Sequence, residues 1–213
     1  MARSSADGYT VLSADNGTLI FNRALFKNLS YNPEQDFTPI GLLAEFPLFI
    51  AVNQPSGIKT MAELVERAKA NPGQVSFATA GIGSPHQLAM EMLLDKTGLD
   101  MVHVPYKGAA PAIQDVVGGH VPVMITDAAS GMQMLKSGEL LPLAVFGAAR
   151  HPLFPDVSTL SEHGYTDVPM SAWIGMVAPK ATPPAATPSC RSGYATRSPS
   201  RPPAFYTGAC GRF

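Results

Sequence analysis

The sequence predicts an α/β protein built around a largely parallel sheet. From Tyr9 to about Pro179, short apolar runs alternate with segments of helical pattern, which is typical of repeated strand-helix-strand units. The runs are rich in β-branched and aromatic residues, and the helical segments close on glycine, the residue that most easily adopts the left-handed conformation at a helix end. With 213 residues, 46% of them hydrophobic, the chain can build a sizeable core.

The first elements are a strand over 9–14 and a helix over 15–27 that Asp15 or Asn16 caps. A turn-rich connector follows at 31–39.

Residues 40–53 form an apolar stretch that Pro47 interrupts. Because proline cannot donate to a sheet ladder, we expect two shorter strands here rather than one. Thr60 and Glu63 then have the spacing of a capping box, which predicts a helix that ends at 71–73.

Four strand units follow in close succession, and the first three lead directly into helices. The predicted strands are 74–80, 101–106, 121–127 and 140–147, and the predicted helices are 84–98, 110–119 and 128–138. A last strand is expected at 171–179, after a long loop.

The composition changes beyond Pro179. This segment holds six of the twenty prolines and no Leu, Ile, Val or Met, and both cysteines, Cys190 and Cys210, fall in it. It cannot bury enough apolar area to offset its ordering entropy, so we expect residues 181–213 to be disordered. The remainder offers no thiol for catalysis, disulfides or metal binding.

Charge argues against nucleic acid as a partner. The whole chain has a net charge of −1; residues 1–179 carry ten basic and sixteen acidic residues, while 180–213 carry five basic residues and no acidic ones. The main part therefore has no basic stripe for phosphates. An interaction module that works through the basic tail is one alternative function.

Neither a membrane span nor an export signal is evident. No window approaches the roughly 20 apolar residues that a transmembrane helix needs, and the start "MARSSADGYT" has no basic and apolar signal regions. As written, the chain is expected to remain in the cytoplasm.

Three connectors share one design, in which a strand ends, small residues follow and a helix begins. They lie at 13–18, 79–86 and 106–111, and contain the hydroxyl groups of Thr18, Ser84 and Tyr106. A helix start presents unpaired amides and the positive end of the helix dipole, so its natural guest is an anion. Any one loop is as well explained as an ordinary capped turn, but three in succession favour a ligand site at one sheet edge. A carboxylate suits such loops.

The motifs exclude or weaken other chemistries. "GIGSPH" lacks the third glycine of a dinucleotide fingerprint, and no phosphate-loop motif exists. Ser84 and His86 are two residues apart, yet no G-x-S-x-G elbow surrounds the serine, so a Ser/His hydrolase is a minor alternative. No two histidines have the i, i+4 spacing of a helical metal pair. We expect no catalytic residue, metal or cofactor.

Four individual residues have competing interpretations. His103, between two valines of a strand, is interpreted as a packing residue, whereas His86 at a helix start is a cap or a pocket wall. Asp127 at a strand end most simply caps the next helix; if it faces the ligand, it selects an amine or a hydroxyl. Lys107 is interpreted as a solvated surface lysine, with attraction of the anion as its alternative.

Several stretches, in order and spacing, resemble the Bug family, the extracytoplasmic solute receptors of tripartite tricarboxylate transporters. They include "ADGYTVL", "DFTPIGLLAEFPLFIAVN", "VSFATAGIGSPHQLAMEML", "VHVPYKGAAPAIQDVVGGHVPVM" and "SAWIGMVAP". The resemblance implies a type II periplasmic binding protein with two Rossmann-like lobes and crossover strands, which closes on a small carboxylate without chemistry. Family members take di- or tricarboxylates, acidic amino acids or aromatic acids and pass them to a membrane permease. It also implies a periplasmic location, and we expect a monomer.

The resemblance also implies a set of ligand-binding residues in four loops. The family motif "SAGxGSxxH" has two residues between its serine and histidine, whereas one residue separates Ser84 from His86. The implied set is Asp15, Asn16, Gly17, Thr18, Thr79, Ala80, Gly81, Gly83, Ser84, His86, Tyr106, Lys107, Gly108 and Asp127.

Two departures from the family pattern predict an incomplete first lobe. Family members have a further strand-loop-helix unit before the segment that begins here, and amphipathic helices after the "AP" at 178–179. We therefore expect 1–52 and 169–180 to be a remnant of lobe 1, and 53–168 to be lobe 2. Receptor function impaired by truncation is the leading hypothesis, and a non-functional fragment is the alternative.

Overall fold

The computed structural model describes residues 2–166, 168, 170–184 and 186, and it divides into two compact units. Unit 1 comprises Met1–Glu45 and Trp173–Phe213, and unit 2 comprises Phe46–Ala172. The boundaries predicted from the sequence, after residues 52 and 168, differ from these by a few residues. Most of the segment expected to be disordered, 187–213, lies outside the described residues.

Unit 2 is organised by a mixed sheet with strand order β6-β2-β5-β3-β4. β3 is parallel to both β4 and β5, whereas β2 is antiparallel to β5 and β6. The carboxyl ends of β3, β4, β5 and β6 therefore lie at the same edge, called the carboxyl edge below. The strands are β2 (Phe37–Asn53), β3 (Ser76–Thr79), β4 (Val102–Pro105), β5 (Val123–Asp127) and β6 (Leu140–Phe146).

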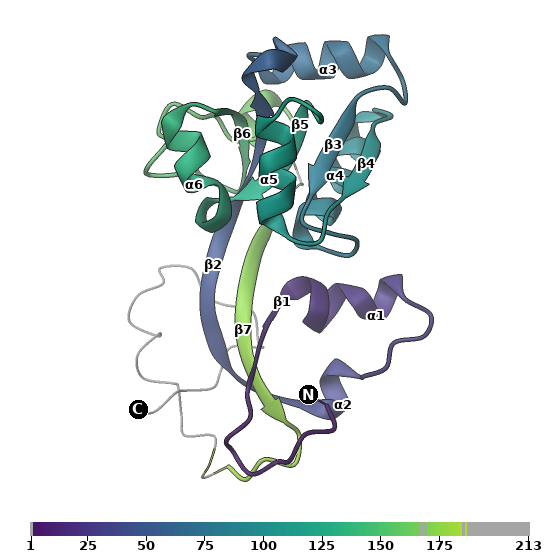
Figure 1. Cartoon of the computed structure of the whole chain (residues 1–213), viewed down its shortest axis with the longest axis vertical. Coiled ribbons are helices and arrows are strands. Elements are labelled where there is room, and N and C mark those ends of the chain that lie inside the picture. Colours follow the sequence, from purple (N-terminus) through teal and green to yellow (C-terminus); the bar gives the residue numbers. More distant parts are fainter. Residues whose placement is uncertain (1, 167, 169, 185, 187–213) are drawn as a thin grey trace. The chain divides into compact units, whose positions relative to one another are not determined.

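Four helices cover the two faces of this sheet (Figure 1). Side chains alternate along β2, so Leu48, Ile50 and Val52 belong to one core cluster and Phe49 and Ala51 to the other. The first cluster packs against α3 and α4, and the second against α5 and α6. The helices are α3 (Met61–Ala70), α4 (Pro85–Thr97), α5 (Ala109–Val117) and α6 (Ala128–Ser137).

Local signals explain where these helices begin and end. Thr60 Oγ1 accepts a hydrogen bond from the Glu63 amide at 3.2 Å, and the Glu63 carboxylate reaches back to the Lys59 amide. Gly98 and Gly138 end α4 and α6 in the left-handed conformation. Short 3-10 turns at Gln54–Ser56 and Ser161–His163 lie in the connections.

Unit 1 has a much smaller core. β1 (Leu12–Asp15) pairs antiparallel with β7 (Ser171–Pro179), and β7 is a neighbour of β2 in the strand order. A five-residue π-helical segment, Gly17–Phe21, continues into α1 (Asn22–Leu25), and α2 is Pro33–Asp36. Within the described part of unit 1, the core cluster contains four buried residues: Ala14, Leu19, Phe37 and Val177.

Two expectations about β-structure and helix length are corrected. Residues 37–53 form one strand that passes through Pro47, not two strands. The cross-strand register to β5 and β6 begins at Leu48, so the missing amide of Pro47 lies outside the ladders with these two strands. The helix expected over 15–27 ends at Leu25. Within the described part of the chain, no helix has the length and apolar character to cross a bilayer.

Candidate functional site

The carboxyl edge of unit 2 places three helix starts in neighbouring positions. α4 follows β3, α5 follows β4 and α6 follows β5, and these strands are adjacent in the sheet. Two backbone hydrogen bonds join the first two loops: the Tyr106 amide donates to Thr79 O at 3.1 Å, and the Gly108 amide to Ala80 O at 2.9 Å. The β3–α4 and β4–α5 loops, which contain most of the predicted residues, therefore lie side by side in unit 2.

The loop between β3 and α4 is held by its own side chains. Ser84 Oγ accepts from the Gln87 amide at 3.3 Å, which caps α4, and donates to Gly81 O at 2.7 Å. The Gly83 amide donates to Gln87 Oε1 at 2.8 Å. Gly81 has φ +149°, and a Cβ there would lie 3.2 Å from Tyr106 O, so glycine permits the two loops to approach closely.

A buried cluster links the start of α4 to the start of α6. His86 Nε2 donates to Asp127 Oδ2 at 3.1 Å, while Asp127 caps α6 by accepting from the Ser130 amide at 2.8 Å and the Ser130 hydroxyl at 3.0 Å. His86 and Asp127 are each only 7% exposed.

Burial alone would raise the pKa of Asp127. The hydrogen bonds from His86 and Ser130 outweigh that effect and hold the pKa below its ordinary value. Asp127 is therefore the helix cap that the sequence favours, and the cap has an additional partner in His86.

The start of α5 differs from the other two. Its N-cap is Gly108, with φ +112° and no side-chain cap, and a Cβ on Gly108 would meet nothing within 4 Å. No described residue accepts a hydrogen bond from the Ala109 or Ala110 amide. Lys107, beside them, is exposed. This helix start offers open amides and a nearby cation to an anionic group.

Two polar groups expected at the ligand are engaged within the protein. The Tyr106 hydroxyl donates a short hydrogen bond to Asp115, and burial together with this bond raises the pKa of Tyr106 to about 12. Thr79 Oγ1 is hydrogen bonded to His103 Nε2 at 2.6 Å.

The ring of His103 stacks on Phe77, with centroids 5.1 Å apart, and burial lowers its pKa. This placement agrees with the interpretation of His103 as a packing residue.

The remaining predicted residues form a turn in unit 1. β1 ends at Asp15, whose Oδ1 accepts from the Thr18 amide at 2.8 Å. Asn16 and Gly17 are buried at the start of the helical segment, and Thr18 O accepts a hydrogen bond from the Tyr31 hydroxyl at 2.7 Å. The strand-to-helix design predicted from the sequence is thus present here as well.

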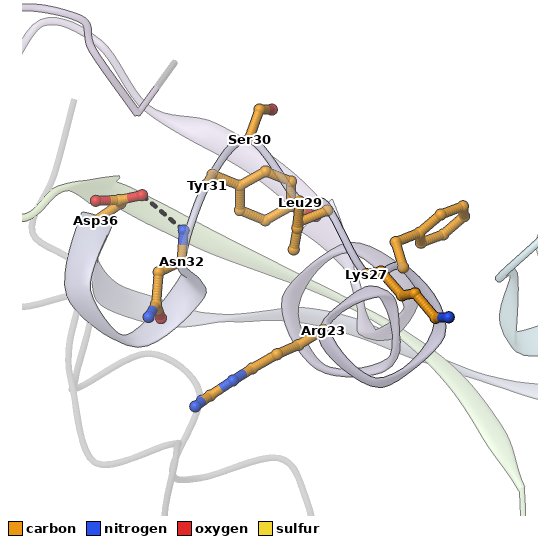
Figure 2. Close-up of a pocket in the computed structure, with 8 residues that line it drawn as sticks. Arg23, Lys27, Leu29, Ser30, Tyr31, Asn32 and Asp36 are labelled. Atoms are coloured by element: carbon orange, nitrogen blue, oxygen red, sulfur yellow. Dashed lines mark hydrogen bonds between the residues drawn. The ribbon is translucent and has the colours of Figure 1, made fainter.

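Two hollows in unit 1 lie around Tyr31, with volumes of about 410 and 430 Å³. Figure 2 shows that the Arg23 and Lys27 side chains at the first hollow point away from one another, while Asp36 bonds the Asn32 amide. Arg23 also pairs with Glu34 at 2.6 Å. The charged side chains of Arg23 and Lys27 at the first hollow therefore do not converge on one binding position.

Sequence reasoning missed the side chains that support the carboxyl edge. Gln87, Asp115 and Ser130 brace the loops, yet none follows a strand directly. The i, i+4 spacing of Gly83 and Gln87 and the i, i+3 spacing of Asp127 and Ser130 were the available signals. Of the described residues, no group of three or more His, Cys, Asp or Glu is placed to hold a metal ion.

Comparison with known proteins identifies relatives of this arrangement. A family model described as the tripartite tricarboxylate transporter family receptor matches residues 1–208. BugT of Bordetella pertussis is 34% identical over 184 residues, covering 86% of this chain and 54% of BugT. The chain thus spans about half the length of this curated relative.

Solved structures agree with the sequence matches. An R. palustris protein solved with adipate has a TM-score of 0.84 at 31% identity, covering 87% of this chain and 62% of that chain. MatC from Rhodopseudomonas palustris, solved with bound malate, has a TM-score of 0.82 at 30% identity, covering 87% of this chain and 63% of that one. These matches confirm the family and the type II periplasmic binding protein fold predicted from the sequence, and the relatives are solute-binding proteins, not enzymes.

Proposed function

The chain belongs to the receptor family of tripartite tricarboxylate transporters, and from this premise we propose that it binds a small carboxylate for delivery to the transporter's membrane subunits. The family is periplasmic, and two of the matched structures were solved with adipate and with malate. The chain spans 54% of BugT. Its ligand binding, its association with the membrane subunits and its action as a monomer are therefore all parts of the proposal.

The observation that supports the proposal most is the open start of α5. Ala109 and Ala110 present amides that no described residue accepts from, at the carboxyl edge and next to the glycine loop that opens α4. A carboxylate with two oxygens can accept from both amides and benefits from the positive end of the helix dipole. Lys107, which directly precedes Gly108 and is exposed, adds a positive charge to the same loop.

The predicted residues contribute in different ways under this proposal. Ser84, His86 and Asp127 hold the loops in place through hydrogen bonds within unit 2, and the Gly83 amide is bonded to Gln87. Gly81 permits the close approach of the two loops, and Gly108 leaves open space beside the start of α5. In unit 1, Asp15, Asn16, Gly17 and Thr18 form the corresponding strand-to-helix turn.

The direct test is isothermal titration calorimetry of the chain against malate, adipate, succinate and citrate, each with its neutral amide as a control. We expect saturable binding of at least one acid and none of the corresponding amide, because the recognised group is the anionic carboxylate. If none of the acids binds, the proposal is wrong for this chain.

A charge variant separates binding from folding. Ala110 is exposed in the first turn of α5, so Ala110→Asp places a negative charge where it stabilises the helix by about 0.3–1 kcal/mol. The same charge repels a carboxylate, and binding should therefore be lost while the protein stays folded. Ala62→Asp, in the exposed first turn of α3, is the matched control that should leave binding unchanged.

A further inference from the structure

His103 lies where it can act on the loop that opens α4. It is the partner of Phe77 in the parallel register between β3 and β4, and the two rings stack. Thr79 follows Phe77 by two residues, so the three side chains share one face of the sheet. His103 Nε2 lies 2.6 Å from Thr79 Oγ1 across the two strands. The histidine therefore contacts the last residue before the loop as well as its packing neighbour.

The Thr79 hydroxyl depends on this contact. Thr79 is fully buried, and a buried hydroxyl without a good partner is costly. Its oxygen accepts from the Gly81 amide at 3.3 Å, while its single proton has two acceptors in range, His103 Nε2 at 2.6 Å and Gly81 O at 3.4 Å. The shorter distance favours His103. Burial lowers the pKa of His103 and so favours the neutral ring that can accept this proton.

The backbone around Thr79 connects the two loops of the site. Thr79 O accepts from the Tyr106 amide at 3.1 Å, and Ala80 O accepts from the Gly108 amide at 2.9 Å. Gly108 is the N-cap of α5. A displacement of Thr79 would therefore be transmitted through these two hydrogen bonds to the open amides at the start of α5.

We propose that His103 is a positioning residue for the carboxylate site. Through Thr79 it fixes the β3–α4 loop against the β4–α5 loop, and it thereby holds the open amides of α5 in place. This inference rests on the proposed function and adds to it a residue that lies in a strand, outside the loops of the site. The ring of His103 packs on Phe77, and its Nε2 atom sets the position of Thr79.

Two substitutions separate the packing of His103 from its hydrogen bond. His103→Phe keeps a ring against Phe77 but removes Nε2, whereas His103→Gln keeps an amide group that can hydrogen bond to Thr79. In calorimetry with malate, adipate, succinate and citrate, His103→Phe should bind about three- to tenfold more weakly than the parent, the effect of one hydrogen bond. His103→Gln should restore most of the affinity, and thermal melting verifies that both variants fold.

Three results of this calorimetry would overturn the inference. If His103→Phe binds as tightly as the parent, or if His103→Gln binds as weakly as His103→Phe, the hydrogen bond does not position the site, and the receptor function stays intact. If none of the four acids binds the parent chain, the receptor function fails and the inference fails with it.

The Thr79 hydroxyl provides a coupled test. Thr79→Val should weaken binding by about the same factor as His103→Phe, and the double variant should bind no more weakly than either single variant, because both remove the same hydrogen bond. Thr97→Val removes a hydroxyl bond to Leu93 O at the other end of α4, so it is the matched control and should keep the parent affinity. Losses that multiply in the double variant would contradict the coupling.

Amide chemical shifts of the ligand-free chain report on the loops directly. His103→Phe should shift the Gly108 and Ala109 amide resonances at the start of α5, and His103→Gln should bring them back toward their parent positions. A histidine that only packs on Phe77 would leave these resonances unchanged in His103→Phe, and that result would overturn the positioning role.

Discussion

Unit 2 and unit 1 use the same strand-to-helix design with very different amounts of core. Unit 2 buries both faces of its sheet, with Phe49, Phe77 and Phe146 fully inaccessible. Among its described residues, unit 1 has a core cluster of four buried residues and exposes large apolar side chains, among them Ile20 at 46%, Leu25 at 46% and Phe26 at 42%. Apolar burial is the main source of stability, so unit 2 should carry most of it.

The chain covers 62% to 63% of the matched solved chains, and the well-packed part of it is unit 2. Exposed apolar side chains promote association, and both units have them, including Ile82 and Leu153 in unit 2. The contrast between the units therefore lies in the sizes of their cores. Trp173 is the single tryptophan and lies in unit 1, so its fluorescence reports on that unit separately.

The largest effect should come from the core of unit 2. Phe77→Ala removes a fully buried ring that stacks on His103, and should lower the free energy of unfolding by about 3–5 kcal/mol. Phe37→Ala in unit 1 should instead shift the urea unfolding transition that is followed by the fluorescence of Trp173. Urea unfolding of both variants is followed by far-UV circular dichroism and by fluorescence. If both variants shift the dichroism transition equally, unit 2 does not carry most of the stability.

A buried amide should have the next largest effect. Asn53 is 1% exposed, and its Nδ2 donates to Val116 O at 2.8 Å and Val121 O at 3.0 Å. Asn53→Ala leaves buried carbonyls without this donor, and should cost about 2 kcal/mol in urea unfolding. Gln54→Ala, at an exposed neighbour that bonds Gly138 O, should change stability by only about 0.5 kcal/mol. If both variants lose a similar amount of unfolding free energy, the burial of Asn53 does not determine the cost of removing its hydrogen bonds.

Acid sensitivity should depend on Asp127. Because its folded pKa lies below the unfolded value of about 3.9, its stabilisation is present above that pH and is lost as the pH falls through the folded pKa. Asp127→Asn should cost about 1–2 kcal/mol at neutral pH and lose less stability than the parent below about pH 4.

The lowered pKa of His103 adds acid sensitivity nearer pH 6.5 in both proteins, so their difference isolates Asp127. Parallel curves of stability against pH would contradict the role given to Asp127.

The smallest effects on stability are expected for two helix-cap variants, and comparing them distinguishes a role in capping from a role in ligand binding. Ser84→Ala and Thr60→Ala each remove one helix cap and should each cost about 1 kcal/mol in thermal unfolding. Only Ser84→Ala loosens the loop at the carboxyl edge, so calorimetry should show weaker carboxylate binding for that variant alone. Equal binding by both variants would indicate that the α4 loop does not contribute.

Local patterns made unit 2 largely predictable. The strand-helix alternation, the capping box at Thr60 and the glycines at helix ends act over a few residues, and the structure follows them. The effect of Pro47 was misjudged because it depends on where pairing with β5 and β6 begins, at Leu48, and the local sequence does not encode this position.

The same reasoning explains which parts of the candidate site were predictable. Helix starts after strands can be read from glycines and caps, whereas the partner of a side chain depends on tertiary packing. His86 and Asp127 lie 41 residues apart and meet only because α4 and α6 begin at neighbouring strands. The sequence places the Tyr106 hydroxyl in a ligand loop but does not reveal its partner. In the structure it donates to Asp115, which lies in α5.

The central claim is that backbone amides at the carboxyl edge of unit 2 hold a small carboxylate. A titration of the ¹⁵N-labelled chain with malate, followed by amide chemical shifts, tests it most directly, with neutral malamide as the control. The account predicts saturable shifts of the Ala109 and Ala110 amides with malate and none with malamide. Absence of any shift at α5, or equal shifts with both compounds, would contradict it.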